Sequence, residues 1–348
     1  MSTLTTRSGA VTLLDYAKSL GPDHKVATAA ELLAQTNEIV TDMLWKEGNM
    51  LTGHRGVIRT GLPSPTWRKL YGGTAPTKSL RATVEDSCGM MEGRTEVDVD
   101  VLNLNGNSAA FRLSESQATA EGMNQAFAQA LIYGDAGLNP EQFNGLHVRY
   151  NTISTGTSEI ARNVISAGGS GNTTSVWLVV WGENTVHGIY PQGSTAGLQH
   201  KDLGEYDAFD ASNNRFRAVG DLWQWKCGLH VKDWRYVVRI ANISMTDLLA
   251  QSGTQANTAA TWLPKLLVKA QARIPFRGMG RAAFYCSRTV KEMLAVGALD
   301  KSQNVLAIQP GFDQYGKVTP GFVQGDLTAH GVPIRTVDRI LETETALT

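Results

Sequence analysis

The chain has 348 residues, enough to bury a large core, and its 42% hydrophobic and 18% charged residues are typical of an ordered protein. Its 32 Lys and Arg residues balance 32 Asp and Glu residues. A formal net charge of zero argues against a protein whose main task is to grip nucleic acid, and it removes a repulsion that would oppose self-association.

The three cysteines and the N-terminus carry no sorting or metal-binding pattern. Cys88, Cys227 and Cys286 are scattered and odd in number, and no C-x-x-C or His-x-x-x-His spacing occurs. The sequence therefore predicts neither a disulfide framework nor a zinc site, and its cysteine usage fits a reducing cytoplasm. Because no basic segment precedes an apolar run and no stretch of about 18 apolar residues occurs, we expect no signal peptide and no membrane span.

A polar stretch opens the chain and leads into a predicted helix from Thr28 to Trp45. Thr28 and Glu31 form a capping box, apolar residues recur on one face, and Gly48 provides a stop.

Residues 48–82 are broken by six glycines and three prolines, yet they are rich in apolar and aromatic residues. A loop of this length is uncommon in a compact domain, and its composition argues against disorder. We therefore expect an extended, two-stranded arm that contacts another chain. The candidate contact residues are Arg55, Arg59, Trp67, Arg68, Lys69 and Tyr71. Stacking on single-stranded nucleic acid is the alternative, but zero net charge favours the protein interface.

Strands are predicted for residues 83–112, because acidic residues alternate with valines from Glu96 to Val101. Asp98 and Asp100 share one face there, and a solvated face explains them better than a catalytic pair. A long helix is predicted for residues 114–133. Ser114 and Gln117 form a capping box, and an apolar stripe follows at steps of three and four. Its members are Ala120, Met123, Phe127, Ala130 and Leu131.

The second half of the chain reads as a mixture of strands and helices. Alternation of apolar and polar residues over 222–240, with a turn at Lys232–Asp233, predicts a long amphipathic hairpin. Pro264 should force a break or a restart in a helical stretch over 246–273. The other predicted elements are strands at 176–181, 281–286, 305–308 and 334–340 and helices at 158–165 and 288–296.

The most enzyme-like string is Gly311–Lys317, which matches the first seven positions of a phosphate-binding P-loop. Val318 stands where a Ser or Thr hydroxyl should meet magnesium, and Pro320 blocks the helix that should follow, so a Gly-rich hairpin tip is the better interpretation. The seven histidines stand at no ligand spacing, and His230 on the polar face of its strand is expected to be surface-exposed or hydrogen-bonded. We predict no catalytic residue, no metal site and no cofactor.

Several strings, taken in order, resemble those of one known family. They are residues 130–135 (ALIYGD) with 139–146 (NPEQFNGL), 179–182 (VVWG) with 188–191 (GIYP), 233–242 (DWRYVVRIAN), 281–294 (RAAFYCSRTVKEML) and 331–338 (GVPIRTVD). The chain resembles the major capsid proteins of tailed bacteriophages, in particular a subfamily of short-tailed phages. The resemblance covers nearly the whole chain.

The resemblance implies the α+β Johnson fold and a division of the chain into parts. These are an N-terminal arm (1–47), an extended loop (48–82), a peripheral domain (83–150) with the spine helix 114–133, a first axial part (151–200), the long hairpin in the peripheral domain (201–245), a second axial part (246–330) and a C-terminal return strand (331–348).

The function that this resemblance implies is a major capsid protein, which self-assembles as hexamers and pentamers into the icosahedral shell around packaged double-stranded DNA. The implied partners are copies of the chain, a scaffolding protein, a portal protein and a decoration protein, with no sequence-specific DNA contact and no membrane. The implied location is the virion, after assembly in the host cytoplasm. Some relatives weld subunits with a lysine–asparagine isopeptide bond, for which Lys69 is a candidate. The alternative is a nucleotide-binding enzyme that uses Gly311–Lys317.

Overall fold

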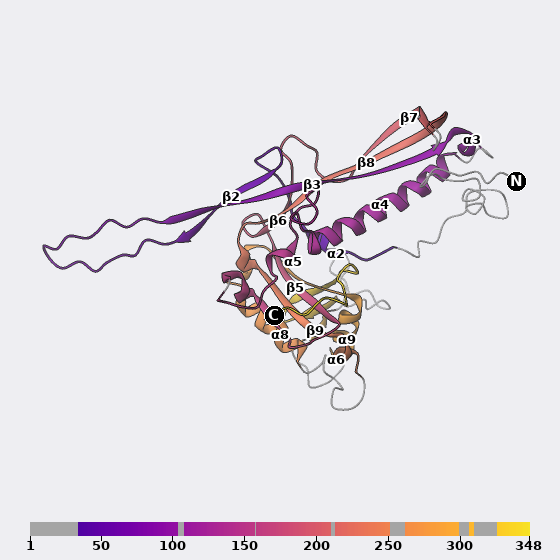
Figure 1. The fold of residues 1–348 in the computed structure, drawn as a ribbon. Coiled ribbons are helices and arrows are strands. Elements are labelled where there is room, and N and C mark those ends of the chain that lie inside the picture. Colours follow the sequence, from indigo (N-terminus) through magenta and orange to yellow (C-terminus); the bar gives the residue numbers. More distant parts are fainter. Residues whose placement is uncertain are drawn as a thin grey trace. The chain divides into compact units, whose positions relative to one another are not determined.

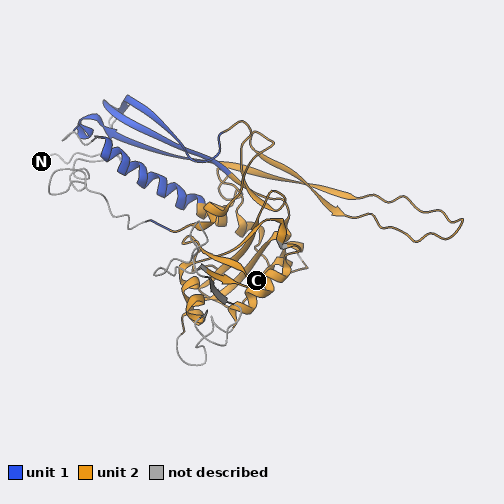
Figure 2. Cartoon of the chain, turned by 180° about the vertical axis from the view of Figure 1, so that it is seen from behind, with its two compact units in different colours: residues 1–35, 90–127, 195–227 blue, residues 36–89, 128–194, 228–348 orange. Residues whose placement is uncertain are grey.

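A computed structural model gives the fold of the chain. It describes residues 34–103, 108–156, 158–209, 213–250, 262–298, 306–309 and 326–348. Two compact units divide the chain, as Figure 2 shows in two colours. Unit 1 comprises Met1–Gln35, Met90–Phe127 and Thr195–Cys227, and unit 2 comprises Thr36–Gly89, Ala128–Ser194 and Gly228–Thr348.

The core of unit 2 is a mixed sheet around β5 (Thr173–Trp181), all of whose residues are buried (Figure 1). Its continuous apolar run predicts a strand covered on both faces, and the structure confirms this. The strand pairs antiparallel with β9 (Val237–Ser244) and β10 (Arg281–Cys286), and β10 pairs parallel with β13 (Val332–Thr336). The remaining strands around it are β4 (Val164–Ser166), β6 (Val186–Tyr190), β11 (Leu306–Gln309) and β12 (Asp326–Ala329).

Three helices pack against this sheet: α6 (Met245–Leu249), α8 (Leu263–Arg273) and α9 (Arg288–Ala298). Leu267 of α8 and Val290 of α9 are fully buried in one cluster with strand residues. Pro264 stands in the first turn of α8, where its missing N–H costs nothing, so it starts this helix. The predicted strand at 281–286 and helix at 288–296 are both confirmed, whereas residues 251–261 lie outside the described part.

The predicted hairpin over 222–240 is wrong. Residues 222–231 belong to β8 (Arg215–Val231), which pairs antiparallel with β7 (Gln199–Phe209) and β6, whereas β9 pairs with β5 and β4. A 3₁₀ turn, η3 (Trp234–Tyr236), separates the two strands, and the Asp233 carboxylate accepts the backbone N–H of Arg235 there. Alternation identifies a strand, but it does not identify the partner of that strand.

In unit 1, residues 108–127 form most of helix α4 (Ser108–Tyr133). The helix starts six residues before the predicted 114, so Ser114 lies inside it and does not cap it. The buried stripe is confirmed, since Phe127 is 1% exposed and stacks on Trp225 with ring centroids 4.5 Å apart. Arg112 from the first turns donates to Asp221 of β8, with Nη2 2.7 Å from Oδ1.

Two other element predictions need correction. The strand β3 (Leu80–Asp98) ends at Asp98, whose carboxylate caps the short helix α3 (Val99–Leu102). The prediction of strands for 83–112 is therefore wrong at 99–102 and at 108–112, which are helical, and residues 104–107 lie outside the described part. The helix predicted for 28–45 is reduced in the described residues to α2 (Glu38–Asp42), and β1 (Trp45–Glu47) follows it as a strand parallel to β6. Residues 28–33 lie outside the described part.

The chain end is bound into the core of unit 2 by a buried ion pair. Arg239 and Glu344 are 0% and 3% exposed at their side chains, with Nη2 2.9 Å from Oε2. Arg239 also donates to the carbonyl of Tyr150 and to the Ser175 hydroxyl. The predicted strand at 334–340 is β13, which lies at 332–336, and the segment after it reaches β5 through a bridge between Thr173 and Glu344. No helix in the described ranges is long and apolar enough to span a membrane.

Candidate functional site

The predicted two-stranded arm exists. Strand β2 (Gly53–Gly61) pairs antiparallel with the first part of β3, from Gly53 opposite Ser87 to Gly61 opposite Leu80. The register slips once, between Arg59 and Gly61. Figure 1 shows residues 62–79 as an open loop that joins the two strands. Glycines and prolines in this segment prevent a regular ladder, so the backbone of the tip lacks the pairing of its base.

The tip of the arm presents large apolar side chains to solvent. Trp67 and Tyr71 are fully exposed, at 104% and 100%, and Leu70 is 87% exposed. A turn closed by the Gly72 N–H on the Lys69 carbonyl (3.0 Å) places Tyr71 at a φ of +63°, a region that bulky residues seldom adopt. An isolated exposed leucine is ordinary, but a group of exposed aromatic and aliphatic residues on one loop marks an interaction surface.

The six candidate contact residues all lie on this arm, in two groups. Trp67, Arg68, Lys69 and Tyr71 share the exposed tip. Arg55 and Arg59 lie on β2, where Arg55 forms an ion pair with Glu85 of β3 and its backbone is held by the Asn49 side chain at 2.8 Å. The structure therefore gives Arg55 a role within the arm, and it brings Arg59 into a groove at the arm's base.

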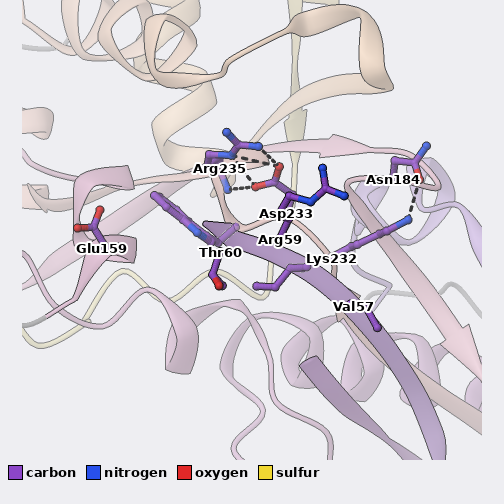
Figure 3. Close-up of a pocket in the computed structure, with 10 residues that line it drawn as sticks. Val57, Arg59, Thr60, Glu159, Asn184, Lys232, Asp233 and Arg235 are labelled. Carbon is purple, nitrogen blue, oxygen red and sulfur yellow. Dashed lines mark hydrogen bonds and ion pairs between the residues drawn. The ribbon is translucent and has the colours of Figure 1, made fainter. Parts of the chain in front are cut away.

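This groove has a volume of about 790 Å³. Val57, Ile58, Arg59 and Thr60 contribute one side from β2, and the other lining residues are Glu159, Asn184, Lys232, Asp233, Trp234 and Arg235. Figure 3 shows the Asp233 carboxylate paired with Arg235 and the Lys232 ammonium directed to Asn184, and these contacts measure 2.7 Å at their shortest. The charges are of both signs and partly satisfied, which suits a polar protein surface better than a small-molecule pocket.

One group of residues in the structure leaves no signal in the sequence. His54, His187 and His230 come from β2, β6 and β8 and lie together in unit 2. His230, which was expected to be surface-exposed or hydrogen-bonded, is buried and lies 2.7 Å from Asp86 Oδ2 through its Nδ1. His187 and His230 are directly opposite each other in the β6–β8 ladder, a relation that depends on strand register and leaves no spacing signal in the sequence. The P-loop-like string Gly311–Lys317 lies outside the described residues.

Comparison with known proteins identifies the family. The sequence matches the major capsid protein GP7 family over residues 21–348. The fold is similar to a chain of the near-atomic-resolution structure of bacteriophage epsilon15, at 28% identity, with a TM-score of 0.74 and 100% of each chain covered. More distant matches are the capsid of bacteriophage JBD30 (10% identity, TM-score 0.46, covering 90% of this chain and 95% of that one) and the capsid of a native GTA particle (10%, 0.45, 63% and 93%). No curated protein matches the sequence.

The family match covers nearly the whole chain, and a phage shell protein aligns with the chain from end to end. Both findings agree with the exposed arm and the α+β fold described above. The chain belongs to the major capsid protein GP7 family, whose members have the Johnson fold of tailed-phage capsids and build the icosahedral shell of the virion.

Proposed function

We propose that the arm is the clasp that joins this subunit to its neighbours in the shell. We define the clasp as β2, the loop 62–79 and the first part of β3, residues 80–87. The observation that carries the proposal is the full exposure of Trp67 and Tyr71. Exposed aromatic rings lose solvent contact only when a partner covers them, and buried aromatic and arginine side chains dominate interface energies.

The groove at the base of the arm is the second part of the proposed contact surface. Its lining mixes Val57, Trp234 and residues of both charges, which is the composition of a protein–protein rim. A shell repeats similar contacts around its hexamers and pentamers, so a surface that projects from one subunit needs a receiving surface on the next. The tip of the arm is the projecting surface, and the groove is the receiving surface. The occupant of the groove is a neighbouring copy of this chain.

The remaining parts of the proposed function follow from the family. Hexamers and pentamers of this chain enclose double-stranded DNA without sequence-specific contact, and a scaffolding protein, a portal protein and a decoration protein are the expected partners. We propose that the N-terminal arm (1–47), the extended loop (48–82), the peripheral domain (83–150), the two axial parts (151–200 and 246–330) and the return strand (331–348) have the roles given above. Residues 201–245 keep the proposed peripheral role but not as one hairpin, because β8 pairs with β7 and β6 and β9 pairs with β5. Expression of the chain alone should give particles of mixed size, and uniform closed shells would contradict a need for scaffolding.

We further propose that the protein has no catalytic turnover. Gly311–Lys317 is followed by Val318 in place of the Ser or Thr of a P-loop, and Pro320 disfavours the helix that a P-loop requires. Lys317→Ala should therefore leave assembly unchanged. Saturable ATP binding that this substitution abolishes would overturn the proposal.

The clasp is tested by Trp67→Ala. Removal of a dominant interface aromatic should weaken assembly by about 2 kcal/mol or more per contact. The melting temperature of the free subunit should stay the same, because Trp67 is fully exposed there. Leu138→Ala is the matched control, since Leu138 is 80% exposed and lies outside the arm. Sedimentation of assembly reactions reports the result. Equal shell yields from Trp67→Ala and the control would overturn the clasp.

A further inference from the structure

The base of the arm holds a cluster of three imidazole rings. His54 stacks edge-on against His230 with ring centroids 4.5 Å apart, and His187 lies 5.2 Å from His230 and 5.9 Å from His54. His187 and His230 are 1% and 0% exposed, and His54 is half-buried at the edge of the cluster. Three strands that are remote in the sequence thus direct one imidazole each to the same point.

The ring nitrogens of this cluster lack the partners that buried nitrogens normally have. Within the described residues, His54 Nδ1, both nitrogens of His187 and His230 Nε2 are buried without a hydrogen bond of normal geometry. The backbone of Gly182 raises the pKa of His187 slightly against the other influences, but neither ring nitrogen of His187 forms a hydrogen bond of normal geometry. Buried polar atoms without partners cost free energy, and a bound ion is one established explanation for them.

The spacing of the nitrogens suits a small cation. One nitrogen of each ring lies within 4.8 Å of the other two. A tetrahedral zinc ion with Zn–N bonds of about 2.0–2.1 Å places its ligand nitrogens about 3.4 Å apart. To bind such an ion, the three nitrogens need to move closer to one another by at most about 1.4 Å, from 4.8 Å to about 3.4 Å.

A carboxylate fixes the orientation of one ring from behind. His230 Nδ1 lies 2.7 Å from Asp86 Oδ2, and Asp86 Oδ1 accepts from Arg149 Nη2 at 2.7 Å. The Asp86 carboxylate, which also accepts the backbone N–H of Val231 at 3.3 Å, is 4% exposed. A proton on Nδ1, shared with the carboxylate, leaves the lone pair of Nε2 directed to the cluster. Metal-binding histidines typically have this arrangement.

The surroundings of His54 and His187 favour the neutral form of these two rings. Burial and the neighbouring imidazoles lower the pKa of His187 to about 4, and burial with the nearby His230 lowers the pKa of His54. Neutral imidazole is the ligand form at neutral pH. Of the cations that face the cluster, Lys46 is paired with Glu183 and Lys232 donates to Asn184.

Gly56 leaves space beside the free nitrogen. A Cβ at this position would stand 2.8 Å from His230 Nε2 and 3.0 Å from Cε1. The glycine on β2 therefore lets this strand pass close to the His230 ring, and a larger residue would collide with it.

We propose that His54, His187 and His230 bind one divalent transition-metal ion of the zinc class through their ring nitrogens, with water as the fourth ligand. Three neutral nitrogens favour zinc or its neighbours over calcium and magnesium, which prefer oxygen. The half-exposed His54 leaves a path for the water and for entry of the ion. The ion would cross-link β2, the first strand of the arm, to β6 and β8 of its own subunit. The proposal rests on geometry within one subunit, so it is independent of the clasp.

The test is metal binding by the full chain, freed of metal with a chelator and titrated with Zn²⁺. We expect one tightly bound ion per chain and a higher melting temperature. Co²⁺ in place of Zn²⁺ should give the intense visible absorption of tetrahedral coordination. His187→Gln should weaken Zn²⁺ binding at least about 100-fold, and Asp86→Asn, which alters only the outer shell, about 10- to 100-fold. His330→Asn is the control, because His330 is exposed and remote from the three strands in sequence.

If His187→Gln fails to fold, His54→Gln replaces it, since His54 is only half-buried. Zn²⁺ binding by the wild-type chain that neither cluster variant reduces would show an adventitious surface site and overturn the proposal. Absence of stoichiometric Zn²⁺ binding by the folded wild-type chain would overturn it equally.

Discussion

The Arg239 guanidinium and the Glu344 carboxylate form an ion pair with almost no access to solvent, 2.9 Å between Nη2 and Oε2. Desolvation lowers the pKa of Arg239, and the charge of Glu344 opposes that shift. Tyr133 and Ser175 donate their hydroxyls to the same carboxylate, at 2.5 Å each. Glu344, four residues before Thr348, thus connects the C-terminal segment to the central sheet of unit 2.

Loss of either charge from this pair should be costly. Glu344→Ala leaves the Arg239 cation buried without its counter-ion, so the free energy of unfolding should fall by about 3–5 kcal/mol. The double variant Arg239→Met, Glu344→Leu removes both charges and should recover part of that loss. Urea denaturation of the free subunit measures both. A Glu344→Ala chain as stable as the wild type would show that the pair contributes nothing.

Phe127 should be one of the most sensitive positions in unit 1. It is 1% exposed and stacks on Trp225, and truncation of a buried Phe costs about 3–5 kcal/mol. Phe127→Ala should therefore give insoluble chain or a lowered melting temperature. Phe209, which is 44% exposed, supplies the control, because Phe209→Ala should change stability by less than about 1 kcal/mol. Equal melting temperatures of Phe127→Ala and Phe209→Ala would show that the apolar stripe of α4 is not part of the core.

The groove at the base of the arm gives a prediction about assembly alone. Val57 lines it and is 55% exposed in the subunit. Val57→Asp should leave the subunit stable, yet it should weaken assembly by about 1–3 kcal/mol per contact, because a neighbour would cover the new carboxylate. Light scattering during assembly reports the effect. Leu138→Asp, an equally polar change on an exposed site away from the groove, should assemble normally. Similar kinetics for both variants would exclude the groove from the interface.

His147 should make stability depend on pH. Burial lowers its pKa below the ordinary 6.5, the charge of Arg239 adds to this shift, and the charge of Glu344 opposes it. The ring also contacts Tyr133, with centroids 5.4 Å apart. Because the pKa of His147 is lower in the folded state, the unfolded chain binds more protons than the folded chain just below pH 6.5. The stability that the neutral His147 ring contributes is therefore fully present above pH 6.5, and it is lost as the pH falls through the folded-state pKa.

His147→Phe keeps the ring packing and removes the proton site. The variant should lose less stability than the wild type between about pH 7 and about pH 5. Urea midpoints at the two pH values measure this, and the difference between the chains isolates His147 from other buried histidines. Parallel losses in both chains would show that His147 does not titrate in this range.

Local patterns in the sequence predicted most of the described elements. The apolar run of β5, the stripe of α4 and the breaks in 48–82 each follow from neighbouring residues alone. The strand partners of 222–240 did not, because alternation fixes which face is apolar and leaves the pairing to the rest of the fold. The early start of α4 was missed because Ser114 can cap a helix, yet it can also lie inside one.

The candidate site was predictable only where it is continuous in sequence. Trp67 and Tyr71 were found because glycines, prolines and aromatics coincide in one segment. The histidine cluster was missed because His54, His187 and His230 are brought together by the pairing of β6 with β8 and by the order of strands in the sheet. A search for adjacent ligand spacing cannot detect such a group. His230 was expected to be surface-exposed or hydrogen-bonded, and the second alternative is confirmed by its contact with Asp86, although the residue is buried.

Hydrogen exchange over residues 48–82, in the free subunit and in assembled shells, tests the clasp most directly. The loop 62–79 joins two paired strands and carries fully exposed side chains. Ordering the loop costs about 1–2 kcal/mol of backbone conformational entropy per residue. A lone subunit buries little surface of the loop to offset this cost. We predict fast exchange in the loop of the free subunit and strong protection after assembly, with β5 protected in both states. Equal protection of the loop before and after assembly would show that it does not clasp a neighbour.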